Sequence, residues 1–309
     1  MTILIDNSTM EKVASCHTAV AMERVLHLKP KASNFYIEAG TAMHKAWEQF
    51  FLGEDVEVCI QALRSYYSEK LPFFEDLKPS HSLENLESLF RIWASKHPNR
   101  EFAWTPQYVE KGFQVKLFPD LDVELIGKMD TFGAESSGAY CIVDWKTTGR
   151  LDNLWVRKWK SSSQVSAYLY AMQRLFGTQV WVMYIMGLEV KQVPVSDRKC
   201  KEHGIAYSEC YAEHTKWLVD SCYRTKEQIT GWYADAYLIT RDYLNILDSV
   251  KSVEDIHKMP QQGMFNGSCY NCSYHDFCHL FNRKPEAAEQ MFERRPWSPL
   301  DGGEVLREG

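Results

Sequence analysis

Three ionisable residues lie on two consecutive segments of strand composition in the middle of the chain. The first segment carries Gly127-Lys-Met-Asp130, and the next carries Ile142-Val-Asp144-Trp-Lys146. Because side chains of a strand alternate between its faces, Asp144 and Lys146 point to the same side. We expect Asp130 to close its strand beside them. Two carboxylates, a backbone carbonyl and waters form a hard oxygen site suited to Mg²⁺ or Mn²⁺.

Such a site would cut phosphodiester bonds. A divalent metal can clamp a phosphate and lower the pKa of a water molecule that it binds. Lys146 would orient that water or stabilise the negative charge that develops. The alternative is a surface ion pair between Asp144 and Lys146 with no chemical role. We favour the site, because Asp144 follows a run of apolar residues, and a buried ionisable group requires a compensating partner.

A helix after this strand can present further polar groups. Ser161 to Ser163 can cap a helix that runs to Phe176, and Gly177 can end it. Gln164 and Tyr168 lie four residues apart, hence on one helical face that can look into the site. Glutamine can hold a phosphate or water, and tyrosine can bind a phosphate or stack on a base. Tyr168 can equally be a core aromatic whose hydroxyl is hydrogen-bonded.

Basic residues are concentrated just beyond the second strand, although the net charge of the chain is −6. Two tryptophans, Trp155 and Trp159, lie between them, which is a pattern that can hold DNA by charge and by stacking. The alternative is the solvated start of a helix. The basic residues are Lys146, Arg150, Arg157, Lys158 and Lys160.

Three cysteines form a compact set, Cys269-x₂-Cys272-x₅-Cys278. The chain has nine cysteines and no apolar leader, which argues against a disulfide framework. Three thiolates need a fourth ligand to complete a tetrahedral metal site or a four-iron cluster. The other cysteines lack such a pattern, apart from Cys16 near the start of the chain. They are Cys59, Cys141, Cys200, Cys210 and Cys222.

The G-x-x-D, apolar-D-x-K and Q-x-x-x-Y motifs together resemble the PD-(D/E)XK nuclease superfamily, and specifically its RecB-like exonuclease branch. The resemblance implies that His44, in Gly40-Thr-Ala-Met-His44, is a metal ligand. It also implies that Glu110, one strand before Asp130, lies near the site. Without the resemblance, His44 would be read as a structural histidine and Glu110 as an exposed strand residue.

Cys16 and the three later cysteines resemble the ligands of the iron–sulfur members of this branch, which include CRISPR adaptation exonucleases and the AddB nuclease domain. The resemblance implies a 4Fe-4S cluster held by Cys16, Cys269, Cys272 and Cys278. Such a cluster would close a loop of about 250 residues and tie both ends of the chain to the core. A zinc ion on the same thiolates is the alternative.

The order of the expected helices and strands that carry these groups predicts an α/β fold. We expect about five mixed strands flanked by helices, with a helical annex built from both termini. Tyr207 to Leu247 is expected to be one long helical stretch, and Ser8 to cap the first helix. The expected parts are an N-terminal helical region at 1–100, a nuclease core at 101–200, a helical and cluster-binding region at 201–285, and a flexible tail at 286–309.

The function that we expect is a Mg²⁺- or Mn²⁺-dependent deoxyribonuclease that degrades DNA from single-stranded ends, in recombination or DNA repair. No G-x-x-x-x-G-K-[ST] loop is present, so a helicase, recombinase or integrase would be a separate partner. The longest apolar run, Val180 to Leu188, is too short to span a membrane, and we expect a cytoplasmic protein. The alternatives are an endonuclease on the same core, and a DNA-binding assembly factor of a recombination or CRISPR-type complex.

Overall fold

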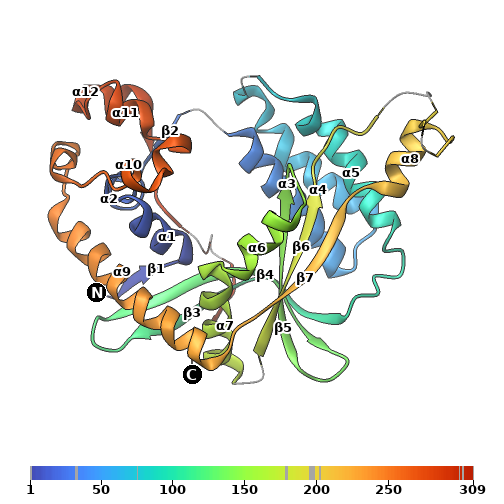
Figure 1. The fold of residues 1–309 in the computed structure, drawn as a ribbon, viewed down its shortest axis with the longest axis horizontal. Coiled ribbons are helices and arrows are strands. Elements are labelled where there is room, and N and C mark those ends of the chain that lie inside the picture. The colour runs from blue at the N-terminus through green and yellow to red at the C-terminus, as the bar shows by residue number, and fades with distance from the viewer. Residues whose placement is uncertain are drawn as a thin grey trace.

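A mixed sheet runs through the centre of the computed structural model (Figure 1), which describes residues 2–31, 34–74, 76–177, 180–194, 199–201, 203–298, 300 and 303–308. Within these residues seven strands have the order β7-β6-β5-β4-β3-β9, with β1 parallel to β4. The strands are β1 Ile3–Ile5, β3 Trp104–Phe118, β4 Val123–Glu135, β5 Tyr140–Thr148, β6 Val180–Glu189, β7 Trp217–Tyr223 and β9 Val305–Arg307. A separate pair joins β2 Leu28–Pro30 to β8 Phe292–Arg294.

Helices cover both faces of this sheet. The longer ones are α1 Asn7–Ser15, α3 Phe35–Leu52, α4 Val56–Ser68, α5 Leu83–Ser95, α6 Asn153–Lys160, α7 Ser163–Phe176, α8 Tyr207–His214 and α9 Lys226–Ser249. The short ones are α2 His17–Val20, α10 Gly263–Asn266, α11 His275–His279 and α12 Pro285–Met291, with a π-helical turn at Ala21–Val25. Turns of 3₁₀-helix lie at Leu71–Phe73, Pro79–His81, Val253–Lys258 and Ser268–Asn271. None of the described helices is both long and apolar enough to cross a membrane.

The order of strands explains where the site can form. β3, β4 and β5 form an antiparallel meander, and β5 then pairs in parallel with β6 after the crossover through α6 and α7. Ser162 caps α7 and Gly177 follows its end, as the sequence predicted. The expected mixed α/β core is confirmed, and the sheet is larger than the five strands expected.

Two hydrophobic cores lie on opposite faces of the sheet. One contains the inner faces of α3, α4 and α5, where Met43, Trp47 and Phe50 recur at helical spacing and are buried. The other packs α1, α7 and α9 against the sheet and includes Ile142 of β5. Its neighbour Val143 belongs to the first core. Because side chains alternate along a strand, β5 contributes residues to both cores.

Segments near the two ends of the chain, residues 17–28 and 260–294, meet beside the second core (Figure 1), where blue and red segments lie together. The amide of Thr18 donates to the carbonyl of Pro260 at 3.3 Å, and that of His17 donates to Gln262 at 2.9 Å. The Tyr274 hydroxyl donates to the carbonyl of Leu28 at 2.7 Å, next to the β2–β8 pair. The expected helical annex from both termini is therefore present.

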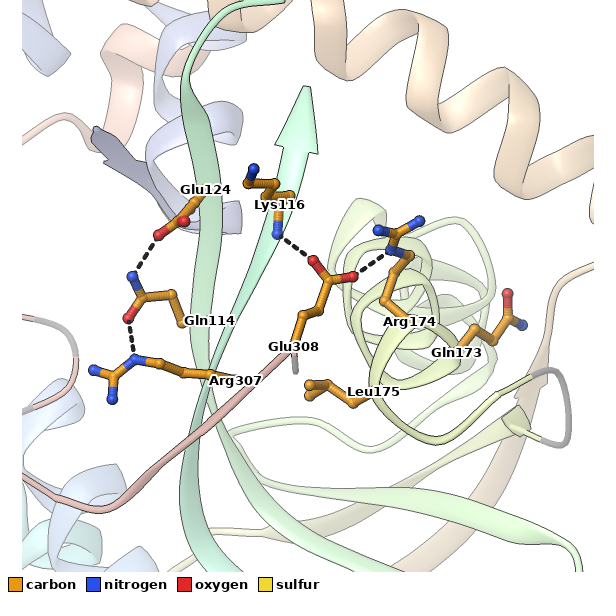
Figure 2. A pocket seen from close by; sticks show the side chains of 8 residues that line it. All are labelled: Gln114, Lys116, Glu124, Gln173, Arg174, Leu175, Arg307 and Glu308. Atoms are coloured by element: carbon orange, nitrogen blue, oxygen red, sulfur yellow. Dashed lines mark hydrogen bonds and ion pairs between the residues drawn. The ribbon is translucent and has the colours of Figure 1, made fainter. Parts of the chain in front are cut away.

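Residues 305–308 lie against the core, inside the region 286–309 for which the sequence predicted a flexible tail. Figure 2 shows Glu308 accepting hydrogen bonds from the Lys116 amide and the Arg174 guanidinium, and Arg307 donating to Gln114. β9 pairs in parallel with β3, and these side chains line a cavity of about 600 Å³. The added strand β9 pairs with backbone groups at the edge of β3 that would otherwise be exposed. Composition alone does not reveal such pairing.

Two other expectations differ from the structure. The stretch from Tyr207 to Leu247 is not one helix, because β7 pairs with β6 between α8 and α9. Only the partner strand decides this, since residues 217–223 have no helix-breaking residue. Asp6, and not Ser8, caps α1: its Oδ1 accepts from the Thr9 amide at 2.7 Å.

Candidate metal centre

The site forms where β4 and β5 separate. Their last backbone pair joins Thr131 to Val143. Beyond it the carboxylate of Asp130 replaces a backbone acceptor, and its Oδ2 accepts from the Trp145 amide at 2.7 Å. We had expected Asp130 to close its strand. It lies instead within β4, which continues to Glu135. The bond fixes the carboxylate in the gap between the two strands, with its Oδ1 turned toward α3.

His44 reaches this gap from α3. Its Nδ1 lies 3.4 Å from Asp130 Oδ1 and 3.8 Å from Glu110 Oε1. Helix α3 can approach β5 closely at Gly40, where a Cβ atom would lie 3.2 Å from the Thr147 hydroxyl. A larger side chain at Gly40, one turn before His44, would therefore hinder the packing of α3 against β5. One ligand atom from each of His44, Glu110 and Asp130 falls within 4.8 Å of the other two.

Glu110 is aimed at the site by an unusual backbone conformation. Its φ is +51°, in the left-handed region, although it lies inside β3 and is not glycine. Such a conformation costs roughly 1–2 kcal/mol and persists where its surroundings compensate for it. Here the Glu110 carboxylate forms an ion pair with Lys128 and faces His44. The possible site residue Glu110 is therefore brought beside His44 and Asp130.

Lys128 is a residue that the sequence reasoning missed. It lies two positions before Asp130, so alternation on the strand places both side chains on the same face. That spacing within Gly127–Asp130 was the available signal. Burial lowers the pKa of Lys128, but Glu110 more than offsets this and raises it, so the ammonium stays charged.

Asp144 and Lys146 lie on the α7 side of the gap. Asp144 is 2% exposed; its Oδ2 lies 2.6 Å from the Lys146 ammonium, and its Oδ1 accepts from Gln164 at 3.0 Å. The ammonium also lies 5.3 Å from the centre of the Trp159 ring, a cation–π distance. Asp144 is buried and Lys146 is half-buried, so this pair differs from the exposed surface ion pair considered as the alternative.

The tryptophans beside this lysine do not stack on DNA as the sequence suggested. Trp155 and Trp159 are 9% and 8% exposed and belong to the core. Trp155 packs over Gly187, where a Cβ atom would lie 2.5 Å from its ring. That hypothesis is therefore wrong for both rings, because the amphipathic helix α6 turns them inward and leaves Arg157 and Lys158 exposed.

Tyr168 lies against the strand that carries Asp130. Its hydroxyl donates to the Lys128 carbonyl at 3.0 Å, and its ring meets Phe113 edge-on at 5.2 Å. Burial, and then the charge of Asp144, raises the pKa of Tyr168, so the hydroxyl remains a donor. Tyr168 and Gln164 line a cavity of about 250 Å³ with the first turn of α1, which brings both onto one side of the site.

The electrostatics of the gap fit a cation. Burial raises the pKa of Asp144, and the neighbouring Asp130 raises it further against the effect of Lys146. Burial lowers the pKa of His44, but Asp130 and Glu110 more than offset this and raise it to about 10. Asp144 Oδ2 is buried against the Lys146 ammonium at 2.6 Å, and Glu110 Oε1 is buried 3.8 Å from His44 Nδ1. These oxygens and the imidazole suit a divalent metal.

The four predicted cluster cysteines line one small cavity. Cys16 comes from the junction of α1 and α2. Cys269 lies in the 3₁₀ turn before α11, Cys272 directly follows that turn, and Cys278 lies in α11 itself. Gly263 makes room for one of them, since a Cβ atom there would lie 2.8 Å from the Cys269 sulfur. His275 and His279 line the same cavity. The fold thus brings together thiolates from opposite ends of the chain.

Comparisons with known proteins agree with this geometry. A family model described as the PD-(D/E)XK nuclease superfamily matches residues 7–279. The crystal structure of a presumed exonuclease from Eubacterium rectale is similar, with a TM-score of 0.54 and 14% identity, over 96% of this chain and 92% of that one. A structure named SSO0001 has 11% identity and a TM-score of 0.34 over 88% and 95% of the chains, too low to support an argument. No curated protein matches the chain.

Proposed function

We propose that this chain, which belongs to the PD-(D/E)XK nuclease superfamily, is a metal-dependent DNA exonuclease of the RecB-like branch with a 4Fe-4S cluster. The observation that carries the proposal is the convergence of His44, Glu110 and Asp130 with the buried pair of Asp144 and Lys146. Four elements, α3, β3, β4 and β5, supply these groups, and a metal held by such a set can activate water for phosphodiester cleavage.

The residues that would hold Mg²⁺ or Mn²⁺ are Asp130 and Asp144, with His44 and Glu110 completing the set. The metal, when bound, supplies Lewis acidity toward the scissile phosphate and acidifies a water molecule. Gln164 holds Asp144 by one oxygen, which leaves the other directed toward Lys146. These contacts orient the carboxylates before any substrate arrives.

Lys146 acts as a fixed positive charge. Burial lowers its pKa, but Asp144 and Asp130 more than offset this and raise it. An ammonium held charged in this way cannot serve as a general base at neutral pH. We infer that it stabilises the negative charge that develops on the phosphate, while the ring of Trp159 limits its movement.

The spacing of the four cysteines supports a cluster in preference to zinc. Two thiolates on one tetrahedral zinc ion lie about 3.8 Å apart, given Zn–S bonds of about 2.3 Å. No three of these four sulfurs fall within 4.8 Å of one another, and all four residues belong to the described chain. A cubane, whose thiolates bind separate iron atoms, accepts wider spacing. Its role here would be to fasten the chain ends.

Three observations support DNA ends as the substrate. The structural neighbour from Eubacterium rectale bears the description of an exonuclease. The cavity beside Gln164 and Tyr168, at about 250 Å³, has room for part of one strand. The resemblance to the RecB-like branch points to single-stranded ends and to a helicase, recombinase or integrase as a partner.

The test is degradation of end-labelled linear single-stranded, duplex and circular DNA with Mg²⁺ or Mn²⁺, using Asp144→Asn as the inactive control. We expect the native protein to shorten linear single strands and to leave circles intact. Cutting of circles would contradict the exonuclease assignment in favour of an endonuclease. Binding of DNA without any cutting by the native protein would favour an assembly factor.

The iron assignment is tested on the same preparation by iron and sulfide analysis and by visible absorbance. We expect a brown protein with about four iron atoms per chain. A colourless protein with one zinc ion on these cysteines would contradict the cluster. Nuclease activity and iron content are independent readouts, so either half of the proposal can fail alone.

A further inference from the structure

A second group of thiol and imidazole side chains lies far from both sites already described. Cys200 and His203 belong to the excursion between β6 and β7, and Cys210 belongs to α8. The Cys200 sulfur lies 3.5 Å from His203 Nδ1, which lies 3.2 Å from the Cys210 sulfur. All three ligand atoms fall within 4.8 Å of one another. In Figure 1, α8 lies at the opposite end of the molecule from α10, α11 and α12.

The local backbone is built to present these side chains together. Lys199 and Ala206 form an antiparallel bridge, and the Cys200 amide donates to the Ile205 carbonyl at 2.7 Å. The Gly204 amide donates back to Cys200 at 2.8 Å, and its φ of +72° is one that glycine adopts without strain. The result is a tight turn that carries Cys200 and His203, followed directly by the helix that carries Cys210.

The distances fit one metal ion. A tetrahedral zinc ion, with Zn–S of about 2.3 Å and Zn–N of about 2.0–2.1 Å, holds a sulfur and a nitrogen about 3.6 Å apart and two sulfurs about 3.8 Å apart. The observed separations of 3.5 and 3.2 Å require shifts of a few tenths of an ångström. The terminal cysteines are more widely spaced, so the two groups suit different metal centres.

The sequence also has the spacing of a zinc site. Cys200-x₂-His203 is followed after six residues by Cys210-x₃-His214, so two close pairs of ligand types are separated by a short linker. Structural zinc sites typically draw their ligands from two such pairs. His214 is the last residue of α8 and follows Cys210 by one helical turn in sequence.

Much of the described part of the excursion is exposed to solvent. Ile205 and Tyr207 are 36% and 47% exposed, and α8 has only eight residues. A helix this short is unstable without tertiary packing. Tyr211 gives one contact with the body of the protein, since its hydroxyl donates to the Lys191 carbonyl at 3.4 Å. A metal ion can supply the missing stabilisation, as it does in small domains with little core.

We propose that Cys200, His203 and Cys210 bind a structural Zn²⁺ ion that fastens the turn to α8. The site is separate from the nuclease centre and does not rest on the proposed function. Zinc is the fitting metal because two thiolates and imidazole nitrogen form the ligand set that it takes in closed tetrahedral sites.

The test is the zinc and iron content of the purified full-length protein, measured by mass spectrometry of the metals. We expect one zinc per native chain, and loss of that zinc in the double variant Cys200→Ala/Cys210→Ala with iron unchanged. Cys59→Ala is the matched control, since Cys59 is a buried cysteine outside both groups and should keep the zinc. Cys269→Ala should lose iron and keep the zinc.

A second measurement covers the case in which the double variant fails to fold. Zinc removal from native protein by a chelator should expose residues 190–216 to limited proteolysis, and added zinc should restore protection. Replacement by Co²⁺ should give the intense visible bands of a tetrahedral thiolate site in the native protein, weakened in His203→Ala. Zinc that remains in the double variant, or native protein that folds without zinc and carries a Cys200–Cys210 disulfide, would overturn the proposal.

Discussion

The carboxylate centre and the terminal cysteine cavity differ in how the chain builds them. Apart from His44, the carboxylate centre draws on residues 110 to 168, which are carried by adjacent strands and the crossover helix. The cysteine cavity joins residue 16 to residues 269–278, and its walls are short helices and turns. The first is fixed by a hydrogen-bonded sheet, whereas the second exists only when both ends of the chain have docked.

This difference predicts different consequences of damage. A sheet with a buried core on each face keeps its geometry when one side chain in the gap changes. Chain ends that meet through short helices lose much of their mutual restraint when a metal link is cut. Substitutions at the carboxylate centre should therefore reduce chemistry and spare stability, and substitutions at the cysteines should do the reverse.

The largest effect is expected from Cys272→Ser. If the proposed cluster is present, its loss opens a loop of about 250 residues, which in the chain-entropy picture costs on the order of 5 kcal/mol of unfolding free energy. The measurement is iron content together with denaturant unfolding, while the folded fraction should keep its nuclease rate. A variant that loses iron without losing stability would show that the two regions do not differ as described.

Asp130→Asn comes next. The amide keeps an acceptor for the Trp145 amide but removes a negative charge from the site, so the rate should fall roughly a thousandfold, about 4 kcal/mol of barrier. Cleavage rate at saturating Mn²⁺ measures this. Iron content and the unfolding midpoint serve as controls and should match the native protein. If iron is also lost, the two regions are coupled.

Glu110→Gln should have a smaller effect. The carboxylate faces His44 at 3.8 Å and pairs with Lys128, so its neutral analogue should raise the metal concentration for half-maximal cleavage roughly 10- to 100-fold. A titration of the cleavage rate with Mn²⁺ measures this shift. If the Mn²⁺ dependence of cleavage is unchanged, Glu110 does not contribute to metal binding. The backbone at φ +51° would then have no functional explanation.

The smallest effect is expected from Tyr168→Phe. It removes one buried hydrogen bond, to the Lys128 carbonyl, and should lower the free energy of unfolding by about 1 kcal/mol. Activity at saturating metal should change little. A large fall in the cleavage rate at unchanged stability would instead indicate that the Tyr168 hydroxyl contacts the substrate and contributes to cleavage.

Much of the centre could be predicted from sequence because its parts are local. Alternation along β5 places Asp144 beside Lys146, and helical spacing places Gln164 near Tyr168. No pattern in the sequence predicts that the Trp159 ring contacts the Lys146 ammonium, or that β7 interrupts the expected helix. Both depend on which surfaces pack together, and that is set by the whole core.

The sequence by itself determined which chemical groups are available and how they are spaced along each element: the D-x-K strand, the Gly40–His44 turn of helix, and the three clustered cysteines. Backbone periodicity is enough for that. Only the tertiary structure decided that β4 and β5 separate at Asp130, that His44 enters the gap, that Cys16 meets Cys269, and that Cys200 and Cys210 flank His203. These contacts join distant segments, and their positions follow from burial and strand pairing over the whole chain.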